Sequence, residues 1–202
     1  MMLVGFSGKI HTGKTYLTKS ILGKANAEWG RRGFGDLLKE EVSRKFNAPL
    51  DWCYSQEKKS WRIGVPDHIV VYNKRVKIPG YPTPMIRQLL QWWGTEVRRA
   101  NEPDYWVDRM AGGLIEAKRL QLYGLIIDDV RFENEAEFIH EQGGTLIRVN
   151  PYNGWECDKA TAEHESEVAL DSYEGFDLTI TPEYGTLDEH ADMIINLLKR
   201  RA

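Results

Sequence analysis

The architecture of the chain is indicated by one motif near its start, Gly8-Lys9-Ile10-His11-Thr12-Gly13-Lys14-Thr15, which matches G-x-x-x-x-G-K-[ST] at every fixed position. The glycines of this pattern let backbone N–H groups turn inward around a phosphate, and its lysine reaches the outer phosphates of a nucleotide. Its threonine hydroxyl binds Mg²⁺, and the next helix points its positive end at the anion. The alternative is a glycine-rich turn without a ligand. The nucleotide-binding candidates are Gly8, His11, Thr12, Gly13, Lys14 and Thr15.

The flanks of the motif alternate between strand-like and helix-like patterns. Residues 2–6 are an apolar run typical of a buried parallel strand, and residues 14–28 form an amphipathic pattern with Gly30 as its stop. Later strands are predicted at 122–128, 145–149 and 176–180, and helices at 37–46, 84–99, 104–119, 133–142 and 187–200. Strands that alternate with helices predict an α/β fold with a parallel sheet.

Residues 48–82 interrupt this alternation. The segments His68–Tyr72 and Arg75–Ile78 flank Asn73-Lys74, which predicts a β-hairpin. We therefore expect one domain, 1–202, that carries an insertion at about 48–82.

Composition excludes several classes of protein. The 202 residues carry a net charge of −3, so a generally basic nucleic-acid-binding protein is not expected. No uncharged run approaches the ~18 residues of a membrane span, and the N-terminus lacks the basic region of a secretory signal. Cys53 and Cys157 form no C-x-x-C pattern, which argues against a disulfide scaffold and for the cytoplasm. We expect neither a nucleic acid nor a membrane as partner.

The predicted helix 84–99 begins with Thr83 as its N-cap and Pro84 at its first position. At 100° per residue its apolar side chains share one arc, which consists of Ile86, Leu89, Leu90, Trp93 and Val97. A stripe beside that arc consists of Arg87, Gln91, Gly94 and Arg98. The stripe suits an anionic ligand, although a solvated flank of a core helix has the same pattern.

Three further positions have both a functional and a structural interpretation. Asp128 or Asp129, at the end of an apolar strand, suits a Mg²⁺ ligand, or else caps the next helix. Arg131 either faces the transferred phosphate or pairs with Glu133 or Glu135. Trp106 either stacks on a base or belongs to the core.

A phosphate-binding loop alone does not determine the reaction. A signalling GTPase should carry N-K-x-D, whereas Asn73-Lys74-Arg75-Val76 lacks the aspartate. A small kinase instead needs several cations around the transferred group, because that group spreads negative charge over its oxygens.

Together with the phosphate-binding loop, four blocks occur in one order along most of the chain outside 48–82: Phe34-Gly-Asp-Leu-Leu-Lys39, Leu90-Gln-Trp-Trp-Gly-Thr-Glu-Val-Arg98, Asp129-Val-Arg-Phe-Glu-Asn-Glu135 and His164-Glu-Ser-Glu167. This series resembles the deoxynucleoside monophosphate kinases of tailed bacteriophages, within the P-loop nucleoside and nucleotide kinases. The loop is specific to the superfamily only, and the other blocks narrow the resemblance to the family.

The resemblance implies a three-layer P-loop kinase fold with a central parallel sheet in the order 2-3-1-4-5. It also implies transfer of the ATP γ-phosphate to a deoxynucleoside monophosphate, with ATP and Mg²⁺ as cofactors, in the cytoplasm (of the host cell if the chain is phage-encoded). The implied catalytic residues are Lys14, Asp129 and Arg131, with Thr15 and Asp129 at the metal. The implied acceptor-side residues are Lys39, Gln91 and Arg98, to which we add Arg87 and Trp106 from the residue patterns. His164 and Glu167 fall in the lid-side segment.

The sequence departs from the family in two places and leaves two alternatives open. Thr181 replaces an asparagine in the last-strand block, near the expected adenine site, and Gly35 replaces an alanine. The insertion either widens the acceptor site or forms a homodimer contact. A kinase for another phosphorylated acceptor, such as dephospho-coenzyme A, and a nucleotide-dependent switch are the competing functions. We also expect the polar segment 150–167 to close over ATP.

Overall fold

The computed structural model describes residues 1–25, 28–152, 154, 165–183 and 185–201. Its contacts divide the chain into two compact units. Unit 1 contains Met1–Phe34 and Ala111–Ala202, and unit 2 contains Gly35–Met110. The insertion expected at 48–82 falls inside unit 2. Unit 2 is longer than this insertion because it also includes the helical segments on either side of it.

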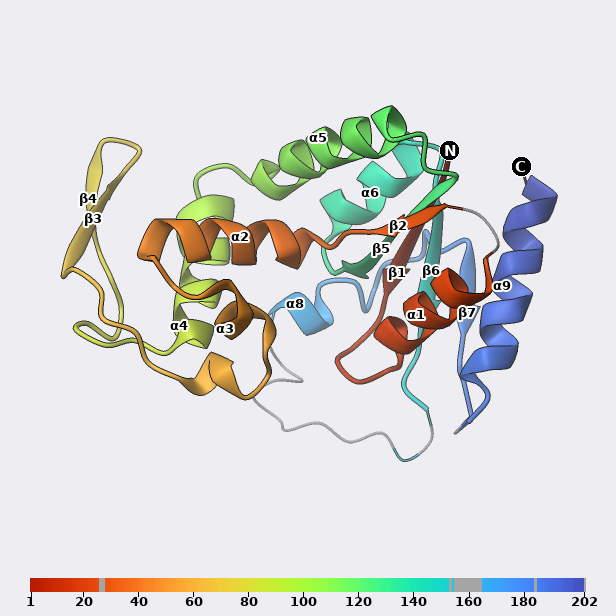
Figure 1. Cartoon of the computed structure of the whole chain (residues 1–202), viewed down its shortest axis with the longest axis horizontal. Coiled ribbons are helices and arrows are strands. Elements are labelled where there is room, and N and C mark those ends of the chain that lie inside the picture. Colours follow the sequence, from red (N-terminus) through yellow and green to blue (C-terminus); the bar gives the residue numbers. More distant parts are fainter. Residues whose placement is uncertain (26–27, 153, 155–164, 184, 202) are drawn as a thin grey trace. The chain divides into compact units, whose positions relative to one another are not determined.

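Unit 1 is built on a five-stranded parallel sheet (Figure 1). Its strands are β1 (Met2–Ser7), β2 (Trp29–Arg31), β5 (Gly124–Val130), β6 (Thr145–Val149) and β7 (Leu178–Ile180). The order across the sheet is β2-β5-β1-β6-β7. Counting only the strands of this sheet, that order is 2-3-1-4-5, so the expected order is confirmed. The central strand β1 is apolar on both faces, as a strand covered by helices on both sides must be.

Helices cover both faces of this sheet (Figure 1). They are α1 (Lys14–Lys24), α6 (Glu133–Glu141) and α9 (Leu187–Arg201). Val4 and Phe6 pack with residues of α1 and α9 in one fully buried cluster. Between them, Gly5 faces the other side, where an added Cβ would lie 2.9 Å from Ile139 of α6. The alternation along β1 therefore produces the three layers that the resemblance implied.

The helix expected at 14–28 was predicted too long. It ends at Lys24, because Ala25 adopts an extended conformation with ψ of 111°. Gly30, expected to stop the helix, lies within β2 and pairs with Leu125 of β5.

Unit 2 is mainly helical and carries a two-stranded hairpin. Its elements are α2 (Phe34–Phe46, which starts in unit 1), α3 (Leu50–Tyr54), the 3-10 helix η1 (Lys58–Ser60), β3 (His68–Val71), β4 (Lys74–Lys77), α4 (Ile86–Gln91), the π-helix η2 (Trp92–Arg99) and α5 (Tyr105–Arg119, which continues into unit 1). The hairpin turn lies at Tyr72 and Asn73, with φ of 50° and 60°. The predicted turn at Asn73-Lys74 is wrong by one residue, because the two-residue turn needs both positive-φ positions.

The helix predicted from Pro84 starts two residues later and changes type. The Gln88 side chain accepts the Met85 N–H at 3.0 Å, so Met85 and not Thr83 is the N-cap. From Trp92 the hydrogen bonds span five residues, and at the end of this segment Ala100 N–H donates to Thr95 O at 2.9 Å. The predicted apolar arc is nevertheless confirmed, because all five of its side chains are at most 8% exposed.

One short helix and a buried cysteine are the remaining features of the described chain that bear on the predictions. Helix α8 (Glu165–Val168) follows a stretch, 155–164, that lies outside the described residues. In the described part of the chain, we find no helix with the length and apolar character that a membrane crossing requires. Cys53 is a buried free thiol, and Cys157 lies outside the described residues.

Candidate functional site

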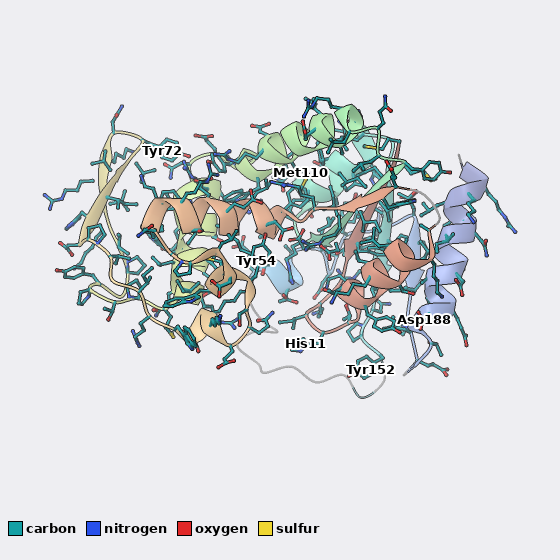
Figure 2. All side chains as sticks on the ribbon, in the orientation of Figure 1. His11, Tyr54, Tyr72, Met110, Tyr152 and Asp188 are labelled. Carbon is teal, nitrogen blue, oxygen red and sulfur yellow. The ribbon has the colours of Figure 1, made fainter. Side chains whose placement is uncertain are left out.

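The loop between β1 and α1 has the backbone that its sequence predicted. Gly8, His11 and Gly13 all have positive φ, at 148°, 62° and 95°. At Gly8 an added Cβ would lie 2.3 Å from the carbonyl oxygen of Val149, so this position requires glycine. The Thr12 hydroxyl, itself buried, donates to Lys9 O at 2.9 Å and fixes the turn. Figure 2 labels the exposed His11 on this loop.

Lys14 lies under the loop with its ammonium group turned inward. Its Nζ donates to Gly8 O and to Lys9 O, each at 2.6 Å, and the residue is only 7% exposed. Burial lowers the pKa of Lys14 from 10.5 to about 7, and the nearby positive charge of Arg131 adds to this effect. Carboxylates nearby act in the opposite direction. An anion with several charges would restore the protonated form. The following residue, Thr15, is exposed.

The two aspartates at the end of β5 have different surroundings. Asp128 is 4% exposed and forms an ion pair with Arg31, 2.6 Å from its Nη2 and 2.9 Å from its Nε. Asp129 Oδ1 accepts the N–H of Phe34 at 2.8 Å, which places its carboxylate at the start of α2. Neither aspartate caps α6 in the way the alternative interpretation supposed. Glu135 has that role, since it accepts the N–H of residues 131 and 132 at 2.7 and 3.2 Å.

Arg131 pairs with a carboxylate from outside its own segment. Its Nη1 donates to Glu167 Oε1 and, at 3.1 Å, to Ser166 O. The pairing with Glu133 or Glu135 that the sequence left open is not what the described residues show. The other oxygen of Glu167 accepts the Ile10 N–H of the phosphate-binding loop at 2.7 Å, and Glu167 is 8% exposed. The Glu167 carboxylate therefore occupies one backbone donor of the loop and the Arg131 guanidinium.

A second carboxylate reaches the loop four residues later. Asp171 accepts from Lys9 Nζ and from Arg148 Nη2, each at 2.8 Å, and Arg148 also donates to Ser7 Oγ at 3.2 Å. The sequence singled out Glu167 only through the family resemblance and missed Asp171 altogether. No local pattern identifies either contact, since the partners are more than 150 residues apart for Glu167 and Asp171. His164, and most of the segment 150–167 expected to close over ATP, lie outside the described residues.

In unit 2 the structure separates the stripe predicted on helix 84–99. Arg87 and Gln91 are exposed, whereas Gly94 is buried and would place a Cβ 3.0 Å from Leu38 of α2. Close approach of another helix thus accounts for this glycine. Arg98 has a side chain 17% exposed and pairs with Glu41 of α2.

Two other acceptor-side candidates have clear surroundings. Lys39 Nζ lies 3.3 Å from Asp36 Oδ1 and 4.4 Å from the ring centre of Tyr54. Trp106 is 3% exposed and donates its Nε1 hydrogen to Gly94 O at 3.2 Å. This corrects the expectation that Trp106 stacks on a base, because its ring is covered by protein, and we leave it out of the candidate site.

Comparisons with known proteins relate the chain to a kinase family. The family model for deoxynucleotide monophosphate kinase matches residues 63–194, more than half of the chain. A protein of Acanthamoeba polyphaga mimivirus named "Putative deoxynucleotide monophosphate kinase" is 29% identical over 211 residues, which cover 97% of this chain and 95% of that protein. Among solved structures, shikimate kinase from Acinetobacter baumannii in complex with shikimate is similar with a TM-score of 0.45 and 12% identity, covering 100% of this chain and 94% of that one.

Proposed function

The chain belongs to the deoxynucleotide monophosphate kinase family, and on this premise we propose that it transfers the γ-phosphate of ATP to the 5′-phosphate of a deoxynucleoside monophosphate. The products are the deoxynucleoside diphosphate and ADP. One observation supports this most directly: a glycine-dependent loop encloses the buried ammonium group of Lys14, which donates to two carbonyl oxygens of that loop.

The residues of unit 1 fit ATP with Mg²⁺. Gly8 has no side chain that would crowd the backbone of the loop, and Lys14 places a cation against that backbone. For the metal we propose the Thr15 hydroxyl and the Asp129 carboxylate. Mg²⁺ keeps most of its waters and binds substrate phosphates, so a small set of oxygen ligands from the protein is sufficient. When bound, the ion would neutralise charge on the β- and γ-phosphates.

The chemical step needs cations more than it needs a base. An acceptor phosphate is largely a dianion near neutral pH, so one of its oxygens can attack the γ-phosphorus directly. A P–O bond forms to that oxygen while the bond to the bridging β–γ oxygen breaks, and ADP leaves with the electron pair. We assign Lys14 and Arg131 to stabilise the charge on the transferred group.

Glu167 must give way when ATP binds. Its carboxylate accepts the Ile10 N–H of the phosphate-binding loop and pairs with Arg131, which the proposal assigns to the transferred phosphate. Release of Glu167 would make both available at the moment the nucleotide arrives.

For the acceptor we propose residues of unit 2, namely Lys39, Arg87, Gln91 and Arg98.

The test is a panel of acceptors with labelled ATP and Mg²⁺: the deoxynucleoside monophosphates, the ribonucleoside monophosphates and dephospho-coenzyme A. We expect label in at least one deoxynucleoside diphosphate. Label in dephospho-coenzyme A alone, or tight ATP binding with slow hydrolysis and no labelled acceptor, would refute the proposal. Arg98→Ala should raise the KM for the acceptor and leave ATP binding intact, whereas Lys14→Ala should impair ATP binding and transfer. The reverse pattern would remove Arg98 from the acceptor side.

A further inference from the structure

In unit 2 a buried carboxylate on α2, that of Glu41, is held by several side chains and is 7% exposed. It accepts from Trp93 Nε1 at 2.9 Å, from Arg98 Nε at 2.7 Å and from the Tyr105 hydroxyl at 2.7 Å. Arg98 Nη2 donates to it as well, and Arg109 Nε lies 3.4 Å away. The Glu41 carboxylate is thus in contact with two guanidinium groups and with the polar hydrogens of two aromatic side chains.

This cluster carries more positive than negative charge. Glu41, Arg98 and Arg109 together have a net charge of +1, although a single arginine would already balance the buried carboxylate. Aromatic rings surround the cations. The Arg98 guanidinium carbon lies 4.3 Å from the Tyr105 ring centre and 4.7 Å from that of Trp93. Such a partly desolvated excess of charge favours an anionic ligand.

The two arginines differ in how many of their nitrogens have partners in the protein. Arg98 uses all three of its nitrogens on the protein, since Nε and Nη2 meet Glu41 and Nη1 donates to the Tyr72 hydroxyl at 3.0 Å. The Arg109 side chain is 44% exposed, and among the described residues its one carboxylate partner is Glu41. The Arg109 guanidinium also lies 4.9 Å from the Tyr105 ring centre and forms a side-chain hydrogen bond with Tyr105. A guanidinium group carries five N–H donors, so the exposed Arg109 side chain keeps further donors for a phosphate.

Local structure explains how these groups meet. Residues five apart in an α-helix lie about 140° apart around the axis, whereas in a π-helix they are one turn apart. The π-helix η2 therefore brings Trp93 and Arg98 to the same carboxylate. On α5, Tyr105 and Arg109 are four residues apart and share a face. The hairpin contributes Tyr72, whose side chain points from the turn toward these helices (Figure 2).

We propose that Glu41 is a positioning residue that holds Arg98 and Arg109 side by side, and that the exposed edge of Arg109 contacts the phosphate of the acceptor nucleotide. This inference rests on the proposed function and adds a residue to the acceptor side. Tyr72 gives the inserted hairpin a part in the same arrangement, since it holds the far end of Arg98.

The experiment compares Arg109→Ala, Arg109→Lys and Glu41→Gln with the wild type, and Arg119→Ala is the matched control on the same helix, where Arg119 pairs with exposed Glu116. For each protein, the KM for the preferred deoxynucleoside monophosphate, the KM for ATP and the inhibition constant of the matching deoxynucleoside, which lacks the phosphate, are measured. We expect Arg109→Ala to raise the acceptor KM by about 10- to 100-fold, the value of a lost charge-assisted phosphate contact.

The deoxynucleoside separates phosphate binding from a structural role. If Arg109 contacts the phosphate, the inhibition constant of the deoxynucleoside and the KM for ATP stay at wild-type values, Arg109→Lys recovers part of the loss, and Glu41→Gln shows the same selective loss. Equal losses for nucleotide and nucleoside, or an unchanged acceptor KM in Arg109→Ala, would overturn the inference while the kinase assignment stands. Failure of the wild type on every deoxynucleoside monophosphate would instead refute the proposed function. If Glu41→Gln does not fold, the two Arg109 variants decide.

Discussion

Glu167→Gln tests whether the carboxylate over the phosphate-binding loop competes with the nucleotide. Glu167 accepts the Ile10 N–H at 2.7 Å and pairs with Arg131. The substitution keeps the size of the side chain and removes its charge. We expect the variant to bind a non-hydrolysable ATP analogue more tightly than the wild type.

The magnitude follows from the two contacts. A hydrogen bond to a charged group contributes about 1.5–3 kcal/mol and a neutral one about 1 kcal/mol. Glutamine retains a neutral hydrogen bond to Ile10 N–H but loses the ion pair with Arg131, so displacement should become easier by about 1.5–2 kcal/mol. Each 1.4 kcal/mol is a factor of ten, so the Kd of the analogue should fall about 10- to 30-fold.

Isothermal titration calorimetry with the analogue, with and without Mg²⁺, measures this change. Glu165→Gln is the matched control, because Glu165 lies on the same short helix with an exposed side chain. We expect that control to bind as the wild type does. Weaker binding by Glu167→Gln would refute the reasoning, because it would mean that the carboxylate supports the nucleotide-bound state instead of competing with it.

Three further outcomes follow from the same geometry. Gly8→Ala should destabilise the fold by about 1–3 kcal/mol and abolish ATP binding, because its Cβ would meet Val149 O at 2.3 Å; thermal denaturation and titration with the analogue measure both effects. Since the pKa of Lys14 is about 7, the lysine must regain a proton to bind phosphate above that pH, so the Kd of the analogue should rise about tenfold from pH 6 to pH 8. Lys14→Arg, charged throughout, should lack that part of the rise, and an identical pH profile would contradict the assignment. Asp128→Asn should lower the free energy of unfolding by about 1.5–3 kcal/mol in urea through loss of its ion pair with Arg31, and an unchanged urea midpoint would show that the pair adds no stability.

Some features could be predicted because they depend on local sequence. Glycines that need positive φ, a lysine at a fixed distance from them and apolar runs for the strands are all read along the chain, and the loop and β1 are where the sequence placed them. The helix 84–99 shows the limit of this reasoning. The predicted burial of its apolar arc is confirmed. The assumption of 100° per residue is wrong from Trp92 onward, because the helix becomes π-helical there. A pattern of residue types does not specify which carbonyl each N–H selects.

The carboxylates of the site could not be predicted in the same way. Glu41 is 57 residues from Arg98, and Glu167 is 157 residues from Ile10, so no spacing rule connects them. In the sequence, both look like any other glutamate of a helical segment, and their cationic partners become visible only in the folded structure. Only their burial and their partners distinguish them from the solvated glutamates of the chain.

These two glutamates should nevertheless respond in opposite ways to the same substitution. Glu167 holds one backbone N–H and one guanidinium, both of which a phosphate could take over, so removing its charge favours the nucleotide. Glu41 is bound by four side chains, two of them aromatic donors that a phosphate ligand would not replace, so it remains in place and its loss disorders the arginines. Tighter ATP binding in Glu167→Gln together with weaker acceptor binding in Glu41→Gln would distinguish a displaceable carboxylate from a positioning one. A change of the same sign in both would mean that the number of donors around a buried carboxylate does not determine its role.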